Sequence, residues 1–224
     1  MKSVSKGFMT IAAAAALVAA SASASHAGPA WEFTSPGTSF NNNTWDFGAI
    51  FTVTSPVTVS GLGYYADPNN GQVASNPVNL YSCADANCAT MGSLLASAIV
   101  TNAFPLQGHF RYVTIAPITL APGAYEVDGV SFGDNYTWND PGFSTDPSIT
   151  YVANSDVWEQ ISTPDFLTPG TGGNDGVTDG YWGPDLFLGA ATFTGTVPEP
   201  GTLSLLAVGF AGIGLIRRRK ANQA

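Results

Sequence analysis

Hydrophobic and polar residues alternate with a period of two along much of the chain between residues 45 and 194. In one clear case, Val57 and Val59 alternate with Thr58 and Ser60. This alternation predicts half-buried β-strands, and no segment in this region has the three-to-four-residue spacing of an amphipathic helix. The predicted strands cover residues 45–54, 57–66, 78–83, 94–101, 109–115, 123–132, 149–153 and 187–194.

Proline and glycine divide this pattern into short elements. Because proline cannot donate a hydrogen bond to a strand ladder, four prolines are expected between strands: Pro56, Pro77, Pro117 and Pro122. Gly61 and Gly63 predict a bulge within the second strand. Eight or nine short strands with tight connections predict an all-β fold, an antiparallel β-sandwich of jelly-roll type.

The N-terminus has the three parts of a secretory signal peptide. Lys2 and Lys6 precede an apolar run over residues 8–20, and small residues then lead to Ala27. This order predicts a signal peptide over residues 1–27 that signal peptidase cuts between Ala27 and Gly28. The apolar run is short and rich in alanine, so we expect it to be removed and not retained as an anchor.

The C-terminal segment 197–224 also has three parts. They are the motif Val197-Pro198-Glu199-Pro200, an uncharged and mostly apolar stretch over residues 202–216, and the cluster Arg217-Arg218-Arg219-Lys220. The apolar stretch predicts a transmembrane helix that just spans the inner membrane. By the positive-inside rule, the basic cluster would stay in the cytoplasm and the domain at residues 28–196 would lie outside.

This arrangement of motif, short transmembrane run and basic cluster resembles the PEP-CTERM sorting signal of exported proteins in Gram-negative bacteria that make exopolysaccharide. The resemblance implies that an exosortase, a membrane-embedded cysteine transpeptidase, recognises the tail and cuts near the motif. It also implies a protein that is first anchored in the inner membrane and then found at the cell surface or in the extracellular matrix.

The domain between these ends is strongly acidic. Residues 28–196 contain 15 acidic residues and a single lysine or arginine, Arg111, which gives a net charge near −14. Such a surface repels nucleic acid and anionic lipid, so neither is an expected partner. It is suited to cation binding or simply to solubility.

Cys83 and Cys88 are the only cysteines and are separated by four residues. In an exported protein this spacing predicts a disulfide that closes a small loop. A zinc site would need more ligands than two thiols without a neighbouring histidine.

Candidate catalytic residues are scarce. His109 is the only histidine outside the signal peptide, the domain has no lysine, and motifs of serine hydrolases, zinc proteases and phosphate loops are missing from it. We therefore expect a non-enzymatic protein without a cofactor. The alternative is a carbohydrate-active enzyme, similar to a glycoside hydrolase, that uses two loop carboxylates.

The stretch from residue 133 to 185 is rich in glycine, proline and acidic residues, yet it also contains many aromatic residues. Aromatic rings with nearby carboxylates and amides are typical of carbohydrate sites, which favours binding of exopolysaccharide. Alternatively, the rings fold back and cap the ends of the sandwich. The candidates are Tyr136, Trp138, Trp158, Tyr181 and Trp182.

Calcium is the other candidate ligand, because it prefers the oxygen ligands of acidic loops. The candidate ligands are Asp134, Asp140, Asp175 and Asp179. The spacing of an EF-hand is missing, so the calcium prediction rests on ligand type alone.

A second resemblance covers residues 45 to 155. Segments 51–65, 78–81, 94–98, 110–113 and 120–125 resemble a β-sandwich domain of undetermined function that recurs in secreted bacterial proteins. That domain is similar in outline to carbohydrate-binding modules. The resemblance implies the fold and assigns no chemistry.

Overall fold

The computed structural model describes residues 27–40, 42–66, 75–133, 136–158, 162–169 and 180–190. None of these residues lies in a helix, and every paired strand runs antiparallel to its neighbour. The all-β prediction is confirmed. The strands are β1 (Gly28–Pro29), β2 (Trp31–Glu32), β3 (Thr38–Phe40), β4 (Trp45–Val53), β5 (Val57–Tyr65), β6 (Asn76–Cys83), β7 (Met91–Val100), β8 (Leu106–Gln107), β9 (Phe110–Leu120), β10 (Gly123–Val130), β11 (Tyr136–Trp138), β12 (Ser144–Thr145), β13 (Ile149–Trp158), β14 (Tyr181–Trp182) and β15 (Pro184–Leu188).

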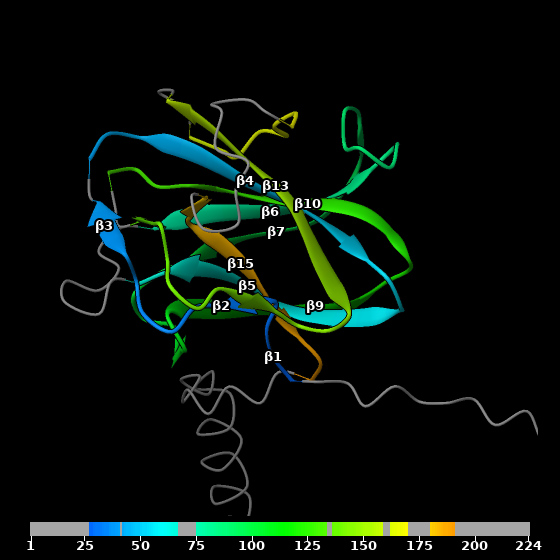
Figure 1. The fold of residues 1–224 in the computed structure, drawn as a ribbon, viewed down its shortest axis with the longest axis horizontal. Helices are drawn as coiled ribbons and strands as arrows, with labels where there is room; N and C mark the ends of the chain where they lie inside the picture. The colour runs from blue at the N-terminus through cyan, green and yellow to red at the C-terminus, as the bar shows by residue number, and fades with distance from the viewer. Residues whose placement is uncertain are drawn as a thin grey trace, which may run out of the picture.

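Two five-stranded sheets make up most of the fold, and they form two layers in Figure 1. The first sheet has the strand order β1-β15-β5-β9-β8, and the second has the order β13-β4-β10-β6-β7. Two small sheets, β14-β11-β3 and β12-β2, complete the described structure.

The hydrophobic core lies between the two large sheets. Alternate residues of β5, such as Leu62 and Tyr64, are fully buried on one side, and Phe51 of β4 and Val127 of β10 are fully buried on the other. These side chains belong to one continuous cluster. The period-two pattern of the sequence therefore corresponds to the inward face of each sheet, and its burial is the main source of stability.

Each of the eight predicted strands overlaps an observed strand, but the expectation that all four prolines lie between strands is wrong for two of them. Pro77 lies inside β6, at a position that pairs with β7 and precedes the part that pairs with β10. Pro117 lies inside β9, where the register with β5 shifts between Ile118 and Thr114. Both prolines are tolerated because neither sits in a ladder with a partner strand on each side.

The bulge predicted near Gly61 is confirmed. The registers of β5 with β9 and with β15 both shift between Val59 and Gly61. Close packing explains the second glycine, since a β-carbon on Gly63 would lie 2.3 Å from the ring of Tyr112. Glycine allows β5 and this ring to approach each other at the centre of the first sheet.

The small sheet β14-β11-β3 contains most of the aromatic candidates. Its strands come from distant parts of the chain, with Tyr136 of β11 paired to Phe40 of β3 and Thr137 paired to Trp182 of β14. The region expected to be irregular is thus partly tied together by short strands.

A segment over residues 162–169, called the strap below, covers the outer face of the second sheet. Phe166 of the strap packs against a small apolar group that includes Ile50 of β4, Ala153 of β13 and Cys88. The outer face of this sheet is therefore partly closed off from solvent.

Candidate functional site

An aromatic cluster surrounds the small sheet and the start of β4. The ring of Tyr136 lies 5.0 Å from Phe40, 4.6 Å from Phe47 and 5.7 Å from Tyr181 between ring centroids. Trp138 stacks on Tyr181 at 6.3 Å. These contacts make one connected layer of rings.

Two of the predicted sugar-binding residues belong to the packing. Trp182 is 1% exposed, and its ring stacks on Phe143 at 4.5 Å and lies 5.9 Å from Trp31. Tyr136 is also buried, and its hydroxyl donates a hydrogen bond to Asn42 Oδ1. Burial raises the pKa of the Tyr136 hydroxyl to about 12. These two rings have almost no surface left for a ligand.

Trp158 has the opposite environment. It ends β13, is 66% exposed, and lies 6.4 Å from the half-buried ring of Trp45. Trp158 is the most exposed of the large hydrophobic side chains that the structure describes, so its ring face is accessible to a ligand. Trp45 is not among the aromatic residues predicted to bind sugar, because its sequence context indicates only the start of a strand.

A buried carboxylate accompanies this exposed ring. Asp156 lies two residues before Trp158 on β13 and is almost completely buried. Its Oδ1 has no hydrogen-bond partner within the described part of the chain. Burial raises the pKa of its carboxyl group. An aromatic face with an adjacent polar group is the combination that sugar rings require.

The calcium candidates are not brought together where the structure describes them. Asp140 accepts hydrogen bonds from the Gly37 amide (2.6 Å) and from Thr137 Oγ1 (2.7 Å), so it anchors a loop. Asp134, Asp175 and Asp179 lie outside the described residues. Within the described ranges, no group of three or more His, Cys, Asp or Glu side chains is arranged to hold a metal ion.

The structure instead places three acidic residues together beneath the strap: Asp46 of β4 and Glu126 and Asp128 of β10. All three are fully buried. The Leu167 amide donates a hydrogen bond to Glu126 Oε1 (3.2 Å), and the Asp165 amide donates one to Asp46 Oδ2 (2.8 Å). Burial raises the pKa of Glu126 to about 8 and that of Asp128 well above its usual range. From the sequence, these three residues are predicted to belong to the acidic surface of the domain.

Glu126, Asp128 and Asp185 do not match the pair of loop carboxylates expected of a glycoside hydrolase. Glu126 and Asp128 lie on a strand and are covered by the strap. Asp185 is fully buried and accepts a hydrogen bond from the Tyr112 hydroxyl. These carboxyl groups are closed to a polysaccharide.

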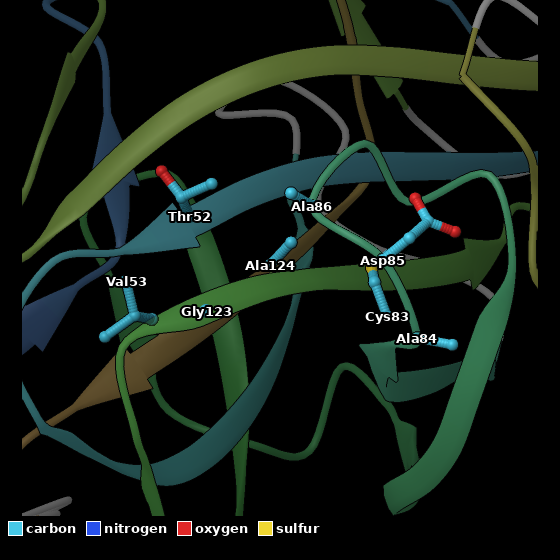
Figure 2. A pocket seen from close by; sticks show the side chains of 8 residues that line it. All are labelled: Thr52, Val53, Cys83, Ala84, Asp85, Ala86, Gly123 and Ala124. Carbon is cyan, nitrogen blue, oxygen red and sulfur yellow. The ribbon is translucent and has the colours of Figure 1, made fainter.

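Two surface hollows offer little chemistry. One, of about 350 Å³, lies between the end of β4, the start of β10 and the turn after β6, and Figure 2 shows that alanine, glycine and other small side chains line most of it. Its only charged group, Asp85, accepts hydrogen bonds from the Asn87 and Ala89 amides. Another, of about 420 Å³, contains Glu32, which pairs with His109 Nδ1 at 2.5 Å.

The two cysteines lie together beside the first hollow. The Cα atoms of Cys83 and Cys88 are 4.9 Å apart, which is within the range of a disulfide. The geometry is thus compatible with the bond that the spacing predicts.

Comparison with protein families gave a match at the C-terminal end of the chain. Residues 196–220 match the family model described as the PEP-CTERM protein-sorting motif. The chain carries a PEP-CTERM sorting motif. It is therefore an exported protein that an exosortase processes and that is sorted through the membrane to the cell surface. Comparisons with curated proteins and with solved structures found no match.

The PEP-CTERM motif and both predicted targeting segments lie largely outside the described residues. This holds for the signal sequence up to residue 26, for Val197 to Pro200, for the expected helix over 202–216 and for the basic cluster. No helix in the described ranges is long and apolar enough to cross a membrane. Gly28, which would begin the mature chain, is the first residue of β1 and pairs with Leu188.

Proposed function

We propose that this PEP-CTERM protein is a non-enzymatic component of the cell surface or extracellular matrix of a Gram-negative bacterium. Signal peptidase removes residues 1–27, the C-terminal helix holds the domain at the inner membrane, and exosortase cleavage near Pro198-Glu199-Pro200 releases it. The observation that carries this proposal is the match of residues 196–220 to the sorting motif.

The absence of a catalytic role is part of the same proposal, and so is the absence of a resident cofactor. It is supported by the environment of the few reactive groups. His109 is paired with Glu32 and stacked on Phe33 at 4.6 Å, which suits a structural role. The carboxyl pair beneath the strap is fully buried, so it does not contact solvent.

We further infer a jelly-roll arrangement, which the strand order supports. When β8 and β13 are set aside, the eight other strands of the two large sheets can be numbered in chain order. With this numbering, the strand order is 1-8-3-6 in the sheet that contains β5 and 2-7-4-5 in the sheet that contains β4. Successive strands thus tend to alternate between layers, as in a jelly roll, with β13 added at one edge.

The corner at Trp45 and Trp158, where the Trp158 ring is exposed, is the proposed contact with exopolysaccharide. Trp158 supplies an apolar ring face on which a sugar ring can stack. Because the domain has a net charge near −14, the favoured polymer is neutral or positively charged.

Mass spectrometry of the mature protein tests the sorting pathway. The protein is recovered from its host with and without the exosortase. We expect the C-terminus to end near Pro198-Glu199-Pro200 only when the enzyme is present, and the N-terminus to be Gly28 in both cases. An identical C-terminus in the two strains would contradict the proposal.

Retention on immobilised polysaccharides tests the binding corner separately. Trp158→Ala should lose retention on a neutral or cationic polymer, because the exposed ring face is removed. Val152→Ala is the matched control, since Val152 is also exposed on β13. Equal retention of the wild-type protein and Trp158→Ala on every polymer that retains the protein would count against this site.

A further inference from the structure

Glu126 and Asp128 form an unusually close pair of acidic side chains. They occupy alternate positions of β10, so both point to the outer face of the second sheet. A β-carbon built on Gly48 of the neighbouring β4 would lie 2.5 Å from Asp128 Oδ1 and 2.5 Å from Glu126 Oε1. The two carboxyl groups therefore converge above Gly48.

Among the described residues, no positively charged side chain pairs with these two carboxyl groups. Both side chains are fully buried, and within the described residues neither oxygen of Asp128 nor Oε2 of Glu126 has a protein donor. Arg111, the single cation of the domain, instead donates to the Phe104 carbonyl at 2.7 Å. Two ionised carboxylates at this position would be strongly unfavourable, whereas a proton between them satisfies both.

We propose that Glu126 and Asp128 share one bound proton, and that this proton holds the strap over residues 162–169 on the second sheet. The ligand of the site is thus a proton and not a metal ion. With the proton in place, one carboxyl donates to the other, and Glu126 Oε1 remains free to accept the Leu167 amide.

The nearby carboxyl groups oppose loss of this proton, whereas the Leu167 amide favours the ionised form of Glu126. Asp46 faces the pair from β4, Tyr81 from β6 and Asp165 from the strap, and each interacts electrostatically with the cluster. On β13, the residue that contacts the strap is Ser155, and its side chain is neutral. A second negative charge would therefore draw water into the site and separate the strap from the sheet.

Apart from the pair, the strap makes one contact to a carboxyl group, from the Asp165 amide to Asp46 Oδ2 (2.8 Å), and three contacts that are neutral. The Pro164 carbonyl accepts hydrogen bonds from Asn79 Nδ2 and the Tyr81 hydroxyl, both at 3.1 Å, and the Thr168 carbonyl accepts one from Ser155 Oγ at 3.0 Å. These bonds do not change between neutral and mildly alkaline pH. The carboxyl pair is therefore the element of this contact that responds to pH, and an exported protein meets the pH of its surroundings directly.

Hydrogen exchange measured by mass spectrometry tests the proposal on the full-length protein in mild detergent. After correction for intrinsic exchange rates, we expect protection of the strap amides to fall about tenfold or more between pH 6 and pH 9. Asp128→Asn should keep its protection over this range, because a neutral amide can donate to Glu126 without a bound proton. Asp85→Asn, which removes a partly exposed carboxylate from the turn after β6, should behave as the wild type.

Equal wild-type protection at pH 6 and pH 9 would overturn the proposal, and so would an unchanged loss in Asp128→Asn. If Asp128→Asn does not fold, the carboxyl groups of the wild-type protein are titrated by carbon-13 NMR instead. The proposal is contradicted if every carboxyl group ionises below pH 5. Calcium that restores protection at pH 9 in the wild type but not in Asp128→Asn would also overturn it, because the site would then hold a cation.

Discussion

Replacing Trp182 with alanine should destabilise the domain far more than the same change at Trp158. Trp182 is 1% exposed, and its ring lies 4.5 Å from Phe143, 5.2 Å from Tyr151 and 5.9 Å from Trp31. Trp158 is 66% exposed and has one close ring neighbour, Trp45 at 6.4 Å. Both residues are tryptophans, and they differ in how much of each ring is buried.

The magnitude follows from the area that each ring buries. A buried tryptophan removes about 200 Å² from water, which at about 25 cal/mol per Å² is an upper limit near 5 kcal/mol. Measured losses for such truncations are about 3–5 kcal/mol, because the cavity collapses only in part. For Trp182→Ala this corresponds to a fall in Tm of about 10 °C. Since Trp158 buries about one third of its surface, its loss should cost about 1.5 kcal/mol or less.

Urea unfolding followed by circular dichroism measures both variants against the wild type. The comparison is valid if the dependence of the unfolding free energy on urea stays the same in all three proteins. Similar losses in the two variants, or a loss below about 1 kcal/mol for Trp182→Ala, would refute the assignment of Trp182 to the core and Trp158 to the surface.

Three further predictions concern pH, the cysteines and close packing. The pKa of Glu126 is about 8 in the fold and about 4.3 in an unfolded chain, so the fold binds the extra proton between these values and loses stability as pH rises. Denaturation at pH 5 and pH 8 should show a loss of about 3 kcal/mol, and Glu126→Gln should reduce it; an equal loss in the variant would argue against this assignment. Reduction of Cys83 and Cys88 should cost about 2 kcal/mol, because the loop they close is short, and no change in Tm would mean that no bond forms. Gly63→Ala should lower Tm, because its β-carbon would meet the Tyr112 ring at 2.3 Å; an unchanged Tm would show that the ring moves aside.

The long strands could be predicted from the sequence because their signal is local. In β5, the alternation that starts at Val57 and Val59 is enough to indicate a strand, and the glycines indicate the bulge. The short strands had no such signal. β11 and β14 have three and two residues, and they pair through Thr137 and Trp182, which are far apart in the chain. Only the packed fold brings them together.

The acidic pair beneath the strap could not be predicted for a similar reason. At alternate positions of a strand, Glu126 and Asp128 read as the solvent face of a sheet. Their burial depends on Pro164, Phe166 and Leu167, which come from a segment that follows almost 40 residues later and folds back over them. Local periodicity carries no information about such a cover.

The sequence by itself determined where this protein goes and to which fold class it belongs. The sorting motif is a contiguous set of residues, and strand periodicity repeats along the chain, so both can be read without knowing the fold. The tertiary structure decided which residues face solvent. Trp158 is exposed and Trp182 is buried, and Asp85 is partly exposed whereas Asp128 is fully buried, because the exposure of a side chain depends on which distant segment packs over it.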